Sequence, residues 1–185
     1  TTSFSVASQE TGPRGLAFSS DGKKFFVVGY QGQDINEYHM TTAFDVSTAS
    51  FDSSFSVSGQ EVYPHALAFN TDGTKMFVNA ANSSDEVVEY TLSTGFDVST
   101  ASYDSSFVSQ SQDTSPQGLA FSNDGKKMFV AGDTGDDINE YTVGTAAIIL
   151  ANPPASGTQI KILHKKGQVW YTAADGYPSN GKGLQ

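Results

Sequence analysis

The sequence predicts an all-β fold built from three copies of one four-stranded unit. The first observation is composition: with 18 Gly, 13 Phe and 8 Tyr among 185 residues, the chain favours strands and turns over helices. The second is that no segment carries a convincing helical hydrophobic period. The third is an internal repeat of roughly 51–52 residues, a length typical of repeated supersecondary units. Together these observations indicate a repeat protein made of short antiparallel strands.

Three landmarks hold the same place in every copy of the repeat. A proline precedes a short Leu-Ala-Phe run, an Asp-Gly pair follows it, and a tyrosine comes later: Pro13, Pro64 and Pro116; Asp21-Gly22, Asp72-Gly73 and Asp124-Gly125; Tyr38, Tyr90 and Tyr141. A near-identical connector, FDVSTASFDS from Phe44 and FDVSTASYDS from Phe96, joins successive copies. Because propeller blades repeat every 40–50 residues or so, we expect β-propeller-like blades at about residues 1–40, 41–92 and 93–143.

Each blade is expected to contain four strands in chain order. The first is a short apolar run that suits an inner, buried position (15–18, 66–69 and 118–121). An Asp-Gly hairpin, whose residues both tolerate a positive φ, leads into the second strand (23–28, 75–78 and 127–130). The third strand (34–38, 86–90 and 137–141) is expected to place its Ile and its Tyr on the apolar face. An outer Ser-Phe-Ser-Val strand (3–6 and 54–57) completes the blade.

The loops between the second and third strands differ from copy to copy, although the scaffold around them is repeated. Variable loops on a rigid scaffold are common places for recognition. The candidate recognition residues are therefore Tyr30, Gln31 and Gln33 in the first copy, Asn82, Ser83 and Ser84 in the second, and Asp133, Thr134 and Asp136 in the third.

Several residue sets could carry chemistry, and each has a simpler structural interpretation. The Asp-Gly pairs could hold calcium, and the acidic loop 133–137 could hold a hard cation through carboxylate oxygens. A hairpin turn and a solvated loop explain these two features more simply. The repeated Tyr could form a ligand platform or, as we favour, a core aromatic. The histidines His39, His65 and His164 occupy non-equivalent positions, and no serine lies in a Gly-x-Ser-x-Gly context. We therefore predict no catalytic, cofactor-binding or metal-binding residue, and no enzymatic activity.

Charge and composition exclude several classes of partner. The net charge of −10 argues against nucleic acid and anionic membranes, since binding their phosphates requires a basic face. The chain has no cysteine, which excludes disulfides and thiolate metal sites. No apolar run approaches the ~20 residues that span a bilayer, so membrane insertion is not expected.

The repeat stops after Val143, and the composition changes at the same place. Residues 144–185 carry Lys161, Lys165, Lys166 and Lys182 against Asp175 alone, and they lack the Phe-Asp-Val-Ser-Thr connector. We expect a small β module and a linker to further structure there. Closed propellers need roughly four to eight blades, so the three blades, which begin at Thr1 without a Met, are expected to be a fragment within a larger assembly. The alternatives are that blades from several chains complete the assembly or that the repeats stack as an open array.

The repeat segments PRGLAFSSDGKKFFVVG, PHALAFNTDGTKMFVNA and PQGLAFSNDGKKMFVAG resemble the propeller repeats of lactonase-like and TolB-like proteins. The connected form, around FDVSTASYDSSF, is similar to repeats found in bacteriophage structural proteins. The tail IILANPPASGTQIKILHKKGQVWYTAADGYPSNGKGLQ resembles β modules of phage tail fibres and other virion proteins. The first resemblance implies fold but no activity, because no matching catalytic His, Asp and Glu set is present.

The resemblances predict a non-enzymatic virion structural protein, such as a tail-fibre, neck or appendage segment for assembly or host attachment. Its partners would be other virion proteins and copies of itself, with a host receptor or glycan as a further partner, and its location the virion. One alternative is a secreted or cell-surface propeller adhesin that binds glycan or protein. A second alternative is a lactonase-like or polysaccharide-degrading enzyme.

Overall fold

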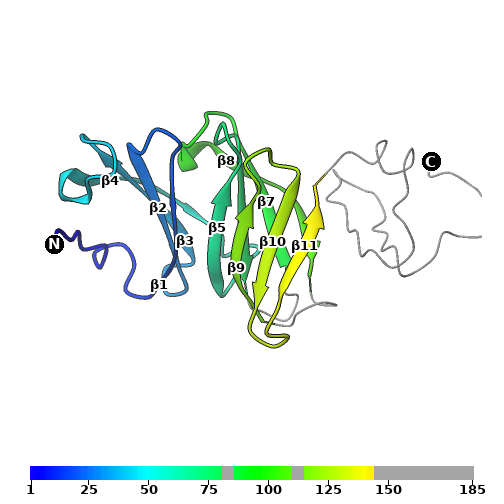
Figure 1. Cartoon of the computed structure of the whole chain (residues 1–185). Coiled ribbons are helices and arrows are strands. Elements are labelled where there is room, and N and C mark those ends of the chain that lie inside the picture. The colour runs from blue at the N-terminus through cyan, green and yellow to red at the C-terminus, as the bar shows by residue number, and fades with distance from the viewer. Residues whose placement is uncertain (81–85, 110–114, 144–185) are drawn as a thin grey trace, which may run out of the picture.

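The computed structural model describes residues 1–80, 86–109 and 115–143 as three antiparallel sheets set side by side (Figure 1). The first sheet contains β1 (Pro13–Phe18), β2 (Lys24–Gly29), β3 (Asp34–Met40) and β4 (Ala49–Ser56). The second contains β5 (Pro64–Phe69), β6 (Lys75–Ala80), β7 (Glu86–Leu92) and β8 (Ala101–Val108). The third contains β9 (Pro116–Phe121), β10 (Lys127–Gly132) and β11 (Ile138–Thr142). The predicted all-β, blade-like fold class is confirmed, and the described part of the third blade holds three strands.

Strands follow chain order within each sheet, so every sheet is an antiparallel meander. The sheets meet through their first strands, because β1 lies against β5 and β5 lies against β9. The first strands of all three blades are therefore the inner strands, as in the radial arrangement of a propeller. The predicted module at residues 144–185 lies outside the described residues.

The core lies between the sheets rather than within one of them. The cluster between the first and second sheets joins Phe26, Val28 and Ile35 to Leu67, Met76, Val78 and Tyr90. The cluster between the second and third sheets joins Phe77, Val87 and Phe107 to Met128, Val130 and Tyr141. The second sheet is covered on both faces, which explains why the second strands are continuous apolar runs instead of alternating ones.

The repeated tyrosines are core residues, as the sequence indicated. Tyr38 and Tyr90 are fully buried and Tyr141 nearly so. The prediction that Ile and Tyr of the third strand share one face was wrong. Ile35 lies in the cluster between the first two sheets, whereas Tyr38 lies in the cluster on the opposite face of the first sheet. Residues three apart in a strand point to opposite sides, and here both sides carry apolar packing.

A Phe from the end of each outer segment packs edge-on against the buried Tyr of the blade that follows. The ring centroids of the three pairs lie 5.5 Å apart for Phe4–Tyr38, 5.3 Å for Phe55–Tyr90 and 4.9 Å for Phe107–Tyr141. Edge-to-face geometry at this separation is favourable for aromatic pairs. Residues 3–6 make this contact without forming the strand that we predicted for them. They have no sheet partner there, although Phe4 still takes the position that Phe55 takes one blade later.

The fourth strands begin earlier than predicted, because the connector is a short 3₁₀ turn that leads straight into them. The turns η1 (Val46–Thr48) and η2 (Val98–Thr100) are both capped by aspartate, Asp45 and Asp97, whose side chains accept from the backbone N–H two residues on. This is the usual N-cap role of Asp. Neither helix is long enough to cross a membrane, and no other helix occurs among the described residues.

The Asp-Gly hairpins are present, but the turn is longer than a two-residue loop. It spans residues 19–23 in the first blade, where the Asp21 carboxylate accepts from the Lys23 N–H at 2.9 Å and from Ser19 Oγ at 2.7 Å. These two bonds lower the pKa of Asp21. Gly22, Gly73 and Gly125 have φ of 68°, 71° and 67°, so the glycine alone of each pair needs the left-handed region.

The inner strand is buried in the second blade but not in the first. Leu67 is 4% exposed, whereas its equivalent Leu16 is 60% exposed. The expectation of a buried first strand was therefore wrong for the first blade. The reason is that Leu16 and Phe18 lie on the face of the first sheet that turns away from the second sheet. No sheet of the described residues covers that face.

Candidate functional site

The inner strands carry three unlike polar side chains at one repeated position. Arg14, His65 and Gln117 each follow the landmark proline and precede the Leu-Ala-Phe run of their strand. Since β1, β5 and β9 lie next to one another, these side chains form a row across the three blades, called here the inner row. Arg14 is also the only arginine in the chain.

Arg14 is held beside the first of the predicted recognition loops. Its guanidinium carbon lies 5.0 Å from the centroid of the Tyr30 ring, which is cation–π geometry. Gly12 lies against the same ring, where a Cβ would approach Tyr30 Cε1 to 2.4 Å, so a larger residue would displace the ring. The backbone pairing of Pro13 with Gly29 fixes this end of the sheet. The row and the loop therefore share one end of the blades.

His65 is the most perturbed member of the inner row. Burial lowers the pKa of His65, and the nearby charge of Arg14 lowers it further, while a hydrogen bond to the Gln117 side chain opposes both effects. The imidazole is therefore neutral at physiological pH. Its Nδ1 is buried and has no hydrogen-bond partner among the described residues. A neutral imidazole carries one donor and one acceptor nitrogen for hydrogen bonds.

The predicted loop residues divide into three groups. Tyr30 is half-buried under Arg14, and Gln33, at φ 53°, donates from Nε2 to the Val62 carbonyl at 3.0 Å, so both belong to the surroundings of the row. Gln31 is exposed beside them, and Asp133, Thr134 and Asp136 are exposed in the third blade's loop. Asn82, Ser83 and Ser84 lie outside the described residues. A recognition role for any of them stays a prediction.

Sequence reasoning missed the inner row. Two signals could have revealed it. The three copies differ at the position that follows the repeated proline, and the chain's only arginine lies at that position. Among the described residues, no group of three or more His, Asp and Glu side chains lies where it could hold a metal ion.

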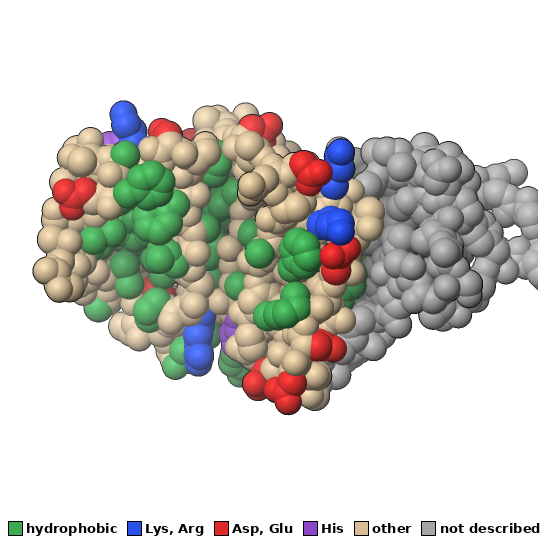
Figure 2. Space-filling view, in the orientation of Figure 1, with side chains coloured by type: hydrophobic (Ala, Val, Ile, Leu, Met, Phe, Trp, Pro, Cys, Tyr) green, Lys and Arg blue, Asp and Glu red, His purple; other side chains and the backbone are tan. Residues whose placement is uncertain are grey.

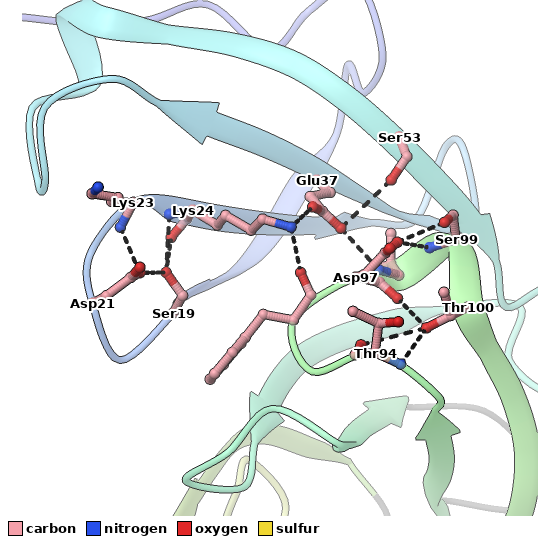
Figure 3. A network of polar contacts seen from close by, with 12 residues as sticks. Ser19, Asp21, Lys23, Lys24, Glu37, Ser53, Thr94, Asp97, Ser99 and Thr100 are labelled. Atoms are coloured by element: carbon pink, nitrogen blue, oxygen red, sulfur yellow. Dashed lines mark hydrogen bonds and ion pairs between the residues drawn. The ribbon is translucent and has the colours of Figure 1, made fainter.

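A second polar feature, called here the inter-blade clamp, joins the first blade to the second (Figure 3). Lys24 Nζ lies 2.5 Å from Glu37 Oε1 and donates to the Phe96 carbonyl at 2.8 Å. The other oxygen of Glu37 accepts from the Val98 N–H at 2.8 Å. Glu37 is 1% exposed, and burial raises its pKa, against the opposing effects of Lys24 and the Val98 N–H. One ion pair thus satisfies two backbone groups of the next blade's connector.

Equivalent ion pairs lie on the second and third blades. Lys75 contacts Glu89 at 2.5 Å and Asp104 at 2.7 Å. Lys127 contacts Glu140 at 2.7 Å, and both side chains are half exposed. The exposure of these pairs rises from the first blade to the third, because only the first pair has a connector over it within the described residues.

A cavity of about 880 Å³ opens at the Asp-Gly end of the blades, where most of its lining comes from the second and third blades and the rest is Phe18 and Ser20 of the first. Phe69, Phe77 and Phe121 lie in its lining, together with the charged groups of Lys75, Glu89 and Asp104. Lys24 and Glu37 hold the connector at the corresponding position between the first two blades. The cavity therefore lies where, one blade earlier, a connector packs against the Lys–Glu pair. We assign no ligand to it.

Comparison with known proteins identifies the fold. No protein-family model and no curated protein sequence matches the chain. Among solved structures, it is similar to a candidate 6-phosphogluconolactonase of Bacteroides fragilis, with a TM-score of 0.56 and 17% identity over 72% of this chain and 35% of that one. It is also similar to the periplasmic gluconolactonase PpgL of Pseudomonas aeruginosa, with a TM-score of 0.54 and 18% identity over 72% and 36%. A nidogen/laminin complex matches with a TM-score of 0.50 and 13% identity over 70% and 44%.

These similarities show that the described blades have a propeller-type fold, like that of the lactonase-type proteins. At identities of 13–18% they show the fold and no activity. The chain spans about a third of the length of the two lactonase-type proteins, since it covers 35% and 36% of them. The predicted lactonase-like resemblance is confirmed for the fold. None of the compared structures supports the predicted link to bacteriophages.

The inter-blade clamp should contribute strongly to stability. Replacing Glu37→Ala leaves a partly buried Lys24 and an unsatisfied Val98 N–H, so we expect the free energy of unfolding to fall by about 3–5 kcal/mol. Urea denaturation followed by circular dichroism measures this change. The matched control is Lys126→Ala, which breaks the exposed pair with Asp124 and should leave the free energy of unfolding nearly unchanged. Equal losses in the two variants would contradict the assignment.

Proposed function

We propose that the chain is a ligand-binding module of the propeller type, and that its inner row takes a small anionic, hydroxylated ligand such as a sugar acid. One observation carries the proposal. An otherwise repeated scaffold places three different polar groups, Arg14, His65 and Gln117, at one position on adjacent strands. Packing alone would favour the same residue in each blade, as it does at the Leu and Phe positions around it.

The chemistry of the inner row suits a carboxylate on a polyol. The guanidinium of Arg14 offers several donors in a planar arrangement, which matches a carboxylate. The neutral His65 and the amide of Gln117 can each donate or accept toward hydroxyl groups. In a chain of net charge −10 a lone arginine at this place provides a local attraction for an anion. This function is closest to the alternative in which the module binds a glycan. A virion setting is compatible with it, but the compared structures give that setting no support.

Titration with gluconate, followed by NMR chemical shifts, tests the binding. Gluconate should perturb the signals around Arg14 and His65, and Arg14→Ala should weaken the affinity at least about tenfold, since a charge-assisted hydrogen bond contributes about 1.4 kcal/mol or more. The affinity of the Arg14→Lys variant should lie between those of the wild type and of Arg14→Ala. The matched control is Lys23→Ala, an exposed cation in the Asp-Gly hairpin at the opposite end of the blade. Unchanged shifts near Arg14, or equal losses in both variants, would overturn the proposal.

Lactone hydrolysis is a second candidate function, favoured by the combination of a neutral His65 and a neighbouring arginine. The His65 imidazole would take a proton from water as the water oxygen attacks the lactone carbonyl. Arg14 would stabilise the oxyanion. The ring C–O bond then breaks, and the proton passes to the leaving ring oxygen to give a hydroxy acid. Two of the similar proteins are named for gluconolactone chemistry, which supports examining this reaction.

Hydrolysis of glucono-δ-lactone, measured by acid release, decides this second candidate. His65→Gln should abolish the release above the spontaneous rate, and the exposed His39→Gln should retain it. Because the pKa of His65 is lowered, its base form persists below pH 6.5, so activity should survive mild acid and fall only as pH drops through the lowered pKa. Wild-type protein with no rate above the spontaneous one would remove this candidate and leave the binding proposal intact.

A further inference from the structure

We propose that a second copy of this chain docks its third blade on the open face of the first blade, so that two copies close six blades into a ring. The open face is the side of the first sheet that turns away from the second. A groove of about 360 Å³ on it is lined by Phe4, Val6, Leu16, Phe18, Phe25 and Val27. This inference does not depend on the proposed ligand.

The open face is an exposed version of an interface that is buried one blade later. Leu16 is 60% exposed where Leu67 is 4% exposed, and Phe44 is 65% exposed where Phe96 packs against the rings of Phe26 and Phe69. Figure 2 shows hydrophobic side chains gathered over the first sheet. An apolar patch of this kind on a soluble protein marks an interaction surface.

The open face also carries the polar groups of this interface, and no Lys–Glu pair of the described residues binds them. The first blade's connector holds Phe44 at φ 58° with its N–H bonded to the Gly22 carbonyl, as Phe96 at φ 57° bonds to Gly73. Phe44 and Val46 therefore present the same backbone groups that Lys24 and Glu37 bind in Phe96 and Val98. These groups lie on the open face, ready for an ion pair from another blade.

The third blade carries the matching ion pair on its own free side. Lys127 and Glu140 correspond to Lys24 and Glu37, and no described connector covers them. Beside them Phe129 and Ile138 correspond to Phe26 and Ile35, which pack against the second blade. Ile138 is 66% exposed, although its equivalent is fully buried. One chain thus displays both halves of a single interface on its two ends.

Two unlike, complementary ends make a head-to-tail contact, which closes into a ring when the rotation between units allows it. Six blades from two chains fall inside the range of about four to eight that closed propellers use. Docking would also place Gln117 of one copy beside Arg14 of the other, as Gln117 lies beside His65 within one chain. The inner row would then continue around the ring.

Sedimentation equilibrium of the whole chain tests the docking. The wild-type mass should be twice the chain mass of 19.6 kDa. Leu16→Asp on the open face and Ile138→Asp on the third blade should each halve the mass, because each places a charge in one half of the interface. The matched control is Tyr103→Asp, a half-exposed aromatic on β8 at the outside of the second blade, which should keep the doubled mass.

Mixing the two disrupted variants separates a head-to-tail contact from a symmetric one. The Leu16→Asp chain keeps an intact third blade, and the Ile138→Asp chain keeps an intact open face, so their mixture should regain a two-chain mass. A wild-type mass of a single chain would overturn the proposal, because it would mean that residues 144–185 or nothing at all covers these faces. A mass above two chains would equally overturn the closed ring, as would disruption by only one of the two variants.

Discussion

Face-to-face packing of successive sheets is the constraint on which the whole molecule depends. The strands Lys24–Gly29 and Lys75–Ala80 are apolar on both sides, so a single blade cannot bury its own apolar side chains. Both described junctions bury a Tyr against a Phe of the preceding blade, and the first junction adds a Lys–Glu pair that binds the next blade's connector. At the junction between the first two blades, where both sides are present, Glu37, Val98 and Tyr90 are at most 1% exposed. Where one side is missing within the described residues, Glu140 is half exposed and Val46 is half-buried, although Tyr38 stays buried in contact with Phe4.

The same constraint determines where function can lie. Positions between blades are committed to packing, and positions on the outer strands repeat with little change. The ends of the inner strands and the loops beside them are not committed in this way, and Arg14, His65 and Gln117 differ there. Their neighbours Gly15 and Ala66 are small because the backbones of β1 and β5 approach closely there, since a Cβ on Gly15 would lie 2.9 Å from the His65 carbonyl oxygen. Tight backbone packing thus positions unlike side chains side by side.

Much of the fold could be predicted from the sequence because the three copies of the repeat can be aligned and compared position by position. The Asp-Gly turns, the strand order and the buried tyrosines followed from that comparison. The partners of Glu37 could not, because its contact with Val98 joins residues 61 apart in the chain and depends on how two sheets stack. The face of Tyr38 was assigned wrongly because both faces of a central strand are apolar. The inner row escaped notice because divergence at one repeated position looks like neutral variation until adjacent strands are seen to align it.

The measurement that tests this account most directly is hydrogen exchange at the Val98 amide, read by NMR. The Val98 N–H begins a short 3₁₀ turn and would exchange quickly if the connector merely lay on the surface. The account predicts exchange as slow as that of the core amides in β2 and β3, since Glu37 binds this N–H in a buried site and the bond opens only when the two blades separate. Exchange at the rate of an unprotected peptide would contradict the claim that the ion pair joins the blades.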